Sequence, residues 1–160
     1  MASAAQIESA ISAGPQGQTQ WLAMPMAQRV ACFEKVVDLY EQHATELFAI
    51  LAREAGKTWL DAVGELREAV DFASFYAQEM ASMPQAKGRG VVSCISPWNF
   101  PLAIFSGQVF AALAAGNAVL AKPAGQTNLV AFRAVQLMHE AGFPVAAIQY
   151  LPGGAKEVGV

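Results

Sequence analysis

The sequence predicts an α/β fold in which helices come first and part of a doubly wound parallel sheet follows. Helical periodicity fills residues 26–84, whereas short apolar runs alternate with helical segments after residue 85. Charge divides the chain at the same place. Residues 1–84 hold 11 acidic and 5 basic side chains, but residues 85–160 hold 2 acidic and 5 basic ones. We therefore expect a lead-in and helical segment over 1–84 and a partial β-α-β-α-β unit over 85–160.

The first half of the chain predicts helices. Residues 2–20 are small, polar and glycine-containing, so we expect an irregular lead-in there. Apolar residues then recur at three- and four-residue steps over 26–56, which predicts one long helix ending at Gly56. The same period over 59–84 predicts a second helix. Its acidic residues are expected mostly on the outer face: Glu65, Glu68 and Asp71.

The second half predicts three strands separated by two helices. Short apolar runs mark the strands: 91–95, 118–121 and 145–151. None alternates apolar and polar residues, and strands that are apolar on both faces belong in parallel sheets covered by helices. Helical segments cover 102–115 and 127–141, with Thr127 as the expected N-cap. This order predicts a doubly wound sheet, which binds ligands at the carboxyl ends of its strands. Three strands with an uncovered edge also favour a piece of a longer protein.

Composition excludes several classes of protein. Hydrophobic residues make up 54% and charged residues 14%, which is the opposite of a disordered chain. The net charge of −3 argues against nucleic acid as a partner, because phosphates require a basic face. The 2 cysteines have no metal-ligand spacing, so we predict neither a disulfide framework nor a metal site. They favour a reducing, cytoplasmic location, and the N-terminus carries no signal-peptide pattern.

A membrane protein is the alternative raised by the charge-free stretch 90–121. About 18 apolar residues suffice for a transmembrane helix. Pro97 and Pro101 interrupt this stretch, however, because each proline removes a backbone donor and clashes with the preceding turn. We therefore expect no membrane span.

Residues that could contact a ligand follow all three predicted strands. Asn99, in the turn 96–101, either donates a hydrogen bond to a developing oxyanion or satisfies the backbone of its own turn. Lys122 closes the second strand and reaches either solvent or the hydroxyls and phosphates of a ligand. The turn 152–159 is rich in glycine and precedes a helix start, which suits close approach to a ligand. Together the three turns favour a nucleotide site.

The same segments resemble the aldehyde dehydrogenase superfamily. Its strand-and-turn signature is similar to residues 92–102, which include Ser96-Pro97-Trp98-Asn99-Phe100-Pro101. Further similar segments follow at the family's spacing: 111–117, 120–124, 140–144 and 151–153. Residues 53–58 and 65–72 resemble the helices that precede that domain. Residues 94–105 are most similar to the glutamate-semialdehyde (pyrroline-5-carboxylate) dehydrogenase module of bifunctional proline-utilization A proteins. The resemblance covers about residues 20–160.

The resemblance implies a role for particular residues. Asn99 matches the amide that holds the oxyanion of the thiohemiacetal, and Lys122 matches the lysine that binds the adenosine-ribose hydroxyls of NAD. Gly125 stands where NAD-preferring relatives often have a ribose-binding glutamate, which leaves the choice between NAD and NADP open. The other residues matching the cofactor channel are Ser96, Pro97 and Trp98 beside the nicotinamide ribose, and Ala155 and Gly159 near the adenosine and pyrophosphate.

The resemblance also implies the function. It predicts a Rossmann-like aldehyde dehydrogenase fold, a small aldehyde as substrate, and a homo-oligomeric parent enzyme that oxidises glutamate 5-semialdehyde to glutamate in proline catabolism. The family's catalytic cysteine and glutamate match no residue here, so we expect this N-terminal fragment to be inactive without the rest of the parent enzyme. Cys32 and Cys94 are expected to be inert, and His43 and His139 solvated. The alternatives are a non-catalytic binding or scaffold module and an aldehyde dehydrogenase for another substrate.

Overall fold

The computed structural model describes residues 1–154, and its elements follow the expected order of helices and then strands. They are α1 (Ala4–Ala23), α2 (Met26–Gln42), α3 (Ala44–Ala55), α4 (Trp59–Ser82), β1 (Val91–Ile95), α5 (Ala103–Ala114), β2 (Ala118–Lys122), α6 (Asn128–Ala141), the 3₁₀-helix η1 (Val145–Ala147) and β3 (Ile148–Tyr150).

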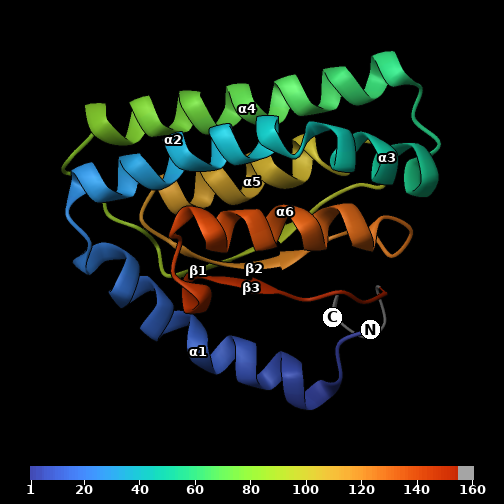
Figure 1. Cartoon of the computed structure of the whole chain (residues 1–160). Coiled ribbons are helices and arrows are strands. Elements are labelled where there is room, and N and C mark those ends of the chain that lie inside the picture. Colours follow the sequence, from blue (N-terminus) through green and yellow to red (C-terminus); the bar gives the residue numbers. More distant parts are fainter. Residues whose placement is uncertain (155–160) are drawn as a thin grey trace.

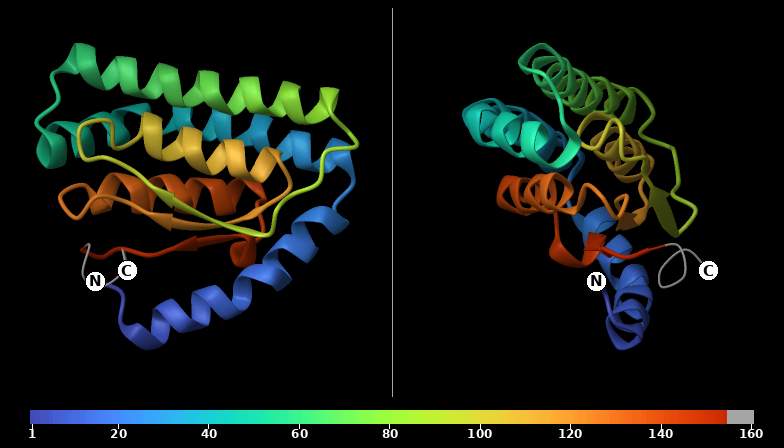
Figure 2. Two further views of the ribbon diagram at one scale, coloured as in Figure 1. Left: turned by 180° about the vertical axis from the view of Figure 1, so that it is seen from behind. Right: turned by 90° about the vertical axis from the view of Figure 1, so that its right-hand side faces the viewer.

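The described strands form one parallel sheet in the order β1-β2-β3. The connecting helices α5 and α6 cover one face of this sheet, and α2, α3 and α4 pack over them as an outer layer (Figures 1 and 2). The helix α1 crosses the other side of the sheet (Figure 1). The predicted α/β class, with helices before a parallel sheet, is therefore confirmed.

The expectation of an irregular lead-in over residues 2–20 is wrong, because α1 fills most of that range. Ser3 and Gln6 form a capping box that starts the helix: the Ser3 hydroxyl accepts from the Gln6 amide, and the Gln6 side chain accepts from the Ser3 amide. The glycines that suggested irregularity serve close packing instead. A Cβ atom at Gly17 would overlap the carbonyl of Ala146, so only glycine lets α1 lie this close to η1.

The single helix expected over 26–56 is two helices, α2 and α3, which meet at His43. His43 leaves helical geometry with φ −96° and ψ 15°. Hydrogen bonds four residues apart continue across it, from His43 N to Leu39 O and from Leu47 N to His43 O. The apolar period therefore runs through the break unchanged and does not reveal it. Gly56 ends α3 with φ +64°, as expected of a C-terminal glycine.

The boundaries in the second half deviate at two places. The third strand begins only at Ile148, because residues 145–147 form η1 after Pro144 and the Ala147 amide donates to the Pro144 carbonyl at 2.9 Å. Thr127 is the N-cap residue of α6, as expected, but its side chain makes no capping hydrogen bond. The charge-free stretch 90–121 divides among β1, α5 and β2. Among the described residues, no helix combines the length and apolar character needed to cross a membrane.

One aromatic cluster joins the two halves of the chain. Trp21 and Phe33 from the helical half pack on Phe110 and Phe143 from the sheet half, with ring centroids 5.1–6.3 Å apart. All four side chains are buried. The Trp21 indole also donates a hydrogen bond of 2.8 Å to the Leu113 carbonyl at the end of α5. Helices α1 and α2 thus share a core with α5 and with the segment that follows α6.

Candidate active-site edge

The carboxyl ends of β1 and β2 lie side by side and start the two turns singled out from the sequence. Ile95 and Lys122 are opposite one another in the parallel ladder, and the Ser96 amide donates to the Lys122 carbonyl at 3.1 Å. Both turns, and the connection between α3 and α4, occupy the same end of the molecule (Figure 1). The structure therefore brings together the turn that carries Asn99 and the strand end that carries Lys122.

The first turn presents its middle residues outward. Ser96 is buried, Pro97 is half-buried, and Trp98 and Asn99 are exposed, with Trp98 retaining 56% of its accessible surface. Within residues 1–154, the Asn99 side chain makes no hydrogen bond. Its amide is therefore free to donate to a ligand.

Helix α4 holds the end of this turn through a buried carboxylate. Glu65, only 2% exposed, accepts hydrogen bonds on Oε2 from the amides of Leu102 (3.1 Å) and Ala103 (2.8 Å), where α5 begins. Its Oε1 forms an ion pair of 2.9 Å with Lys57 Nζ. The expectation that Glu65 faces outward was wrong. It shares a stripe with Ala62, Ala69 and Ala73, and that three- and four-residue spacing was the signal available in the sequence.

The second turn combines a buried cation with an exposed glycine. Lys122 is 9% exposed, and its Nζ has one long hydrogen bond, 3.4 Å to the Pro123 carbonyl. Gly125 is exposed, and a Cβ built there would have no atom within 4 Å. The helix α6 that follows is capped from α3: Glu54 accepts from the amides of Leu129 (2.6 Å) and Val130 (2.9 Å). This distant carboxylate takes the capping role expected of Thr127.

The third turn is described only in part. The Leu151 amide donates to the Ala121 carbonyl at 2.9 Å, which keeps the chain beside β2 as it enters Pro152-Gly153-Gly154. Ala155 and Gly159, the remaining candidate cofactor residues, lie outside the described residues.

Side chains at these strand ends have hydrogen-bonding capacity that the described residues leave unused. Ser96 Oγ and Thr127 Oγ1 are buried and find no partner within residues 1–154, and the buried Lys122 ammonium has two donors to spare. Buried polar groups are normally paired. These residues fit a ligand that brings hydroxyl groups, as the ribose of a dinucleotide does. A phosphate does not suit the starts of α5 and α6, because carboxylates already occupy both.

Neither cysteine is placed to act as a nucleophile at this edge. Both Cys32 and Cys94 are buried thiols, and burial raises the pKa of each, that of Cys94 to about 11. Cys94 lies within β1, where its Sγ faces the Gln108 carbonyl at 3.5 Å. Cysteine reacts as the thiolate, so a raised pKa suppresses its reactivity at neutral pH.

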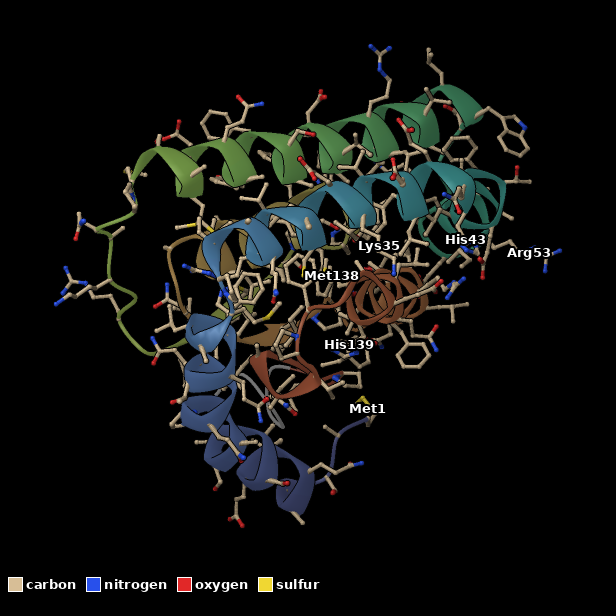
Figure 3. The ribbon with its side chains drawn as sticks, turned by 60° about the vertical axis from the view of Figure 1, so that its left-hand side comes forward. Met1, Lys35, His43, Arg53, Met138 and His139 are labelled. Carbon is tan, nitrogen blue, oxygen red and sulfur yellow. The ribbon has the colours of Figure 1, made fainter. Side chains whose placement is uncertain are left out.

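The two histidines were expected to be solvated, but both contact other residues. His43 Nδ1 lies 3.0 Å from Glu46 Oε2 and 3.2 Å from Arg133 Nη2, and it joins the break between α2 and α3 to α6 (Figure 3). His139, on α6, is half-buried, with Nε2 3.2 Å from the Ile148 carbonyl. Among residues 1–154, no group of three His, Cys, Asp or Glu side chains could hold a metal ion.

Curated proteins similar to this chain are named bifunctional protein PutA and 1-pyrroline-5-carboxylate dehydrogenase. The chain is 47% identical over 161 residues to the bifunctional protein PutA of Klebsiella aerogenes, and the match covers 99% of the chain and 12% of PutA. It is 34% identical over 170 residues to the 1-pyrroline-5-carboxylate dehydrogenase of Staphylococcus aureus strain MW2, with 96% of the chain and 33% of that enzyme covered. The chain thus spans a third or less of the length of either relative.

Solved structures of the same two kinds of protein match the fold. PutA of Bradyrhizobium japonicum gives a TM-score of 0.92 at 42% identity, with 99% of this chain and 18% of that chain covered. The 1-pyrroline-5-carboxylate dehydrogenase from Thermus, solved with bound NAD, gives 0.93 at 33% identity, with coverages of 99% and 34%. The resemblance noted from the sequence motifs is therefore confirmed. The model of the aldehyde dehydrogenase family matches residues 1–160, and the chain belongs to that family.

Proposed function

We propose that this chain supplies the cofactor-binding edge and the oxyanion donor of an enzyme that oxidises L-glutamate 5-semialdehyde to L-glutamate with NAD. The observation that carries the proposal is the juxtaposition of the Asn99 turn and the Lys122 strand end at one edge of a parallel sheet. The choice of substrate is supported by similarity to PutA and to 1-pyrroline-5-carboxylate dehydrogenases across nearly the whole chain.

Each residue of the edge has a role in this proposal. The exposed Asn99 amide donates to the oxygen of the aldehyde as that oxygen becomes an oxyanion, an interaction stronger in the transition state than in the ground state. Lys122, whose ammonium makes one long hydrogen bond within the described residues, donates to the ribose hydroxyls of the adenosine. Ser96, Pro97 and Trp98 line the nicotinamide-ribose side. When bound at this edge, NAD would supply the acceptor for the hydride that leaves the substrate carbon.

The remaining proposed cofactor contacts involve small residues. Gly125 leaves space beside the adenosine ribose and presents no carboxylate, so the edge accepts NADP as well as NAD. Ala155 and Gly159 are proposed to approach the adenosine and pyrophosphate with their backbone. Carboxylates already accept hydrogen bonds from the first amides of α5 and α6, so these helix starts are not free to bind the pyrophosphate. This supports a pyrophosphate site at the third turn.

The nucleophile is proposed to come from a part of the parent enzyme outside this chain. Covalent aldehyde oxidation requires a reactive thiolate, and burial raises the pKa of both Cys32 and Cys94. We therefore expect the purified 160-residue chain to form no NADH from any aldehyde. Aldehyde-dependent NADH formation by the purified chain would contradict this assignment. Loss of that activity in a Cys94→Ala variant would identify Cys94 as the nucleophile.

The function is tested on the enzyme that contains this chain. Initial rates of NADH formation are compared for glutamate 5-semialdehyde and for propanal, and kcat/KM is expected to be at least tenfold higher for the first. Equal values would show an aldehyde dehydrogenase for another substrate. No activity with either aldehyde, in a protein that still binds NAD, would show a non-catalytic binding module.

The assembly and location of the parent enzyme are part of the same proposal. We propose that the parent enzyme is a homo-oligomer in the cytoplasm. The two free thiols support the location only, because they suit a reducing compartment. Light scattering coupled to size-exclusion chromatography checks the assembly, and a mass equal to one chain of the parent enzyme would contradict it.

A further inference from the structure

The residues that hold the Asn99 turn come from a distant part of the chain. Helix α5 begins at Ala103, two residues after the turn 96–101, and its N-cap residue, Leu102, offers no side-chain cap. No acidic residue lies in its first turn either. The amides of Leu102 and Ala103 bind Glu65 instead, at 3.1 and 2.8 Å. A carboxylate at a helix N-terminus satisfies these donors and complements the helix dipole.

A second contact reaches the residue next to Asn99. Lys57 Nζ lies 4.4 Å from the centre of the Phe100 ring, a cation–π distance, and 2.9 Å from Glu65 Oε1. Lys57 thus contacts the residue directly after Asn99 and the carboxylate that fixes the start of α5. The pair is shielded from solvent, since the Lys57 and Glu65 side chains are 15% and 1% exposed. Water therefore competes little with the ion pair, whereas the Phe100 ring is 40% exposed.

We propose that Glu65 and Lys57 are positioning residues for catalysis, which fix the main chain on the C-terminal side of Asn99 so that its amide points at the oxyanion. The proposal rests on the role assigned to Asn99 above. Neither residue touches the substrate. They hold the segment after Asn99 at two points. Lys57 contacts the ring of Phe100, and Glu65 accepts hydrogen bonds from the amides of Leu102 and Ala103. A small misplacement of an oxyanion donor costs rate without changing how the substrate or cofactor binds elsewhere.

The sharpest variant is Glu65→Gln in the enzyme that contains this chain. Its amide oxygen can still cap α5, but its amide nitrogen faces the Lys57 ammonium and cannot accept from it. We expect kcat with glutamate 5-semialdehyde to fall about 10- to 50-fold, whereas the Kd for NAD stays within twofold. Glu68→Gln removes an exposed carboxylate from the same helix and serves as the matched control, with kcat within twofold of the unchanged enzyme.

A double variant separates positioning from a general structural role. If Glu65 acts through Asn99, then Glu65→Gln combined with Asn99→Ala should be no slower than Asn99→Ala alone, because the donor to be positioned is already gone. Multiplied losses in the double variant would overturn the proposal. So would an unchanged kcat in Glu65→Gln when Asn99→Ala is slow. An unchanged kcat in Asn99→Ala itself would instead refute the role of Asn99 and thus the proposed function.

Lys57 provides an independent test if Glu65→Gln fails to fold. Lys57→Arg retains the positive charge beside Glu65 and over the Phe100 ring, and we expect it to keep kcat within about threefold. Lys57→Met loses the charge and should lower kcat at least tenfold with an unchanged Kd for NAD. Equal kcat values for the Arg and Met variants would overturn the positioning role of Lys57.

Discussion

Two hydroxyls at the strand ends lack the kind of partner that a buried hydroxyl in the core has. In the core, the Tyr40 hydroxyl and Ser106 Oγ pair at 3.0 Å, and burial raises the pKa of Tyr40 far above its ordinary value. At the strand ends, Ser96 Oγ and Thr127 Oγ1 are equally buried, yet no described residue pairs with them. An unpaired buried hydroxyl is costly, so a fold tolerates it best where a ligand completes the pairing. This contrast supports the ligand site at the carboxyl edge.

The first prediction at this scale concerns Asn99. In the enzyme that contains this chain, Asn99→Ala should lower kcat by about 10²–10³, the usual effect of removing one oxyanion donor. The KM for NAD should change by less than about threefold, because the amide stabilises the transition state and not the bound cofactor. Asn99→Asp keeps the shape but lacks the donor, so steady-state kinetics should show at least as large a loss. An aspartate variant as active as the unchanged enzyme would contradict the donor role.

A second residue-scale prediction concerns Gly125. Gly125→Glu should weaken NADP binding at least tenfold and leave NAD binding within about threefold, because a carboxylate repels the 2′-phosphate but accepts from the ribose hydroxyls of NAD. The space around Gly125 can hold the new side chain without strain. Lys122→Ala should weaken the binding of both cofactors, and that of NADP more. Titration calorimetry measures each Kd, and Gln136→Glu, an exposed change on α6, controls for added charge. Unchanged NADP affinity in Gly125→Glu would place this turn away from the ribose.

At the scale of elements, local sequence signals predicted most helices and strands but not how they begin or pair. Gly56 ends α3 as expected, and Gly142 ends α6 in the same left-handed conformation, because such a C-terminal residue is encoded locally. Thr127 was correctly placed as the N-cap residue of α6, but the side chain that caps the helix belongs to Glu54, 75 residues before Leu129. Glu65 was placed outside although it shares the spacing of the buried Ala62 and Ala69, and its bonds to the start of α5 are not visible in the sequence. The positions of the Asn99 and Lys122 turns were predictable, whereas the carboxylates that hold them required tertiary structure.

The contact between α6 and β3 predicts a pH dependence of stability. Burial lowers the pKa of His139 below its ordinary value of 6.5, although the Ile148 carbonyl opposes the shift. Above pH 6.5 the imidazole is neutral in both the folded and the unfolded chain and has no effect. As the pH falls below 6.5, the unfolded chain takes up a proton before the folded chain does, so the free energy of unfolding decreases.

Urea unfolding at pH 7.5 and 5.5 tests this contribution. The loss of stability between the two pH values should be smaller in His139→Gln than in the unchanged chain, because glutamine does not titrate. His43→Gln serves as the control for the other histidine. A loss of the same size in the His139 variant would show that this imidazole does not contribute to the pH dependence.

At the scale of the whole molecule, the helical layer acts as the support of the candidate site. Helices α3 and α4 each provide one carboxylate that caps a helix of the sheet half. Glu54 on α3 accepts from amides of α6, and Glu65 on α4 accepts from amides at the start of α5. The aromatic cluster of Trp21, Phe33, Phe110 and Phe143 holds the two halves together. A site of this kind is precise because its turns are fixed from outside the sheet.

The division of the chain near residue 84 stays a prediction, and limited proteolysis checks it. The connection between α4 and β1 contains Lys87 and Arg89, both exposed, so trypsin should cut the folded chain there first. The two pieces should nevertheless elute together in size-exclusion chromatography without denaturant, because the buried rings of Trp21 and Phe33 pack against Phe110 and Phe143. Replacing Lys87 and Arg89 together by glutamine should remove this early cut and leave the later ones unchanged. Pieces that separate after the cut would contradict a shared core, and they would show instead that the helical and sheet halves are independent domains.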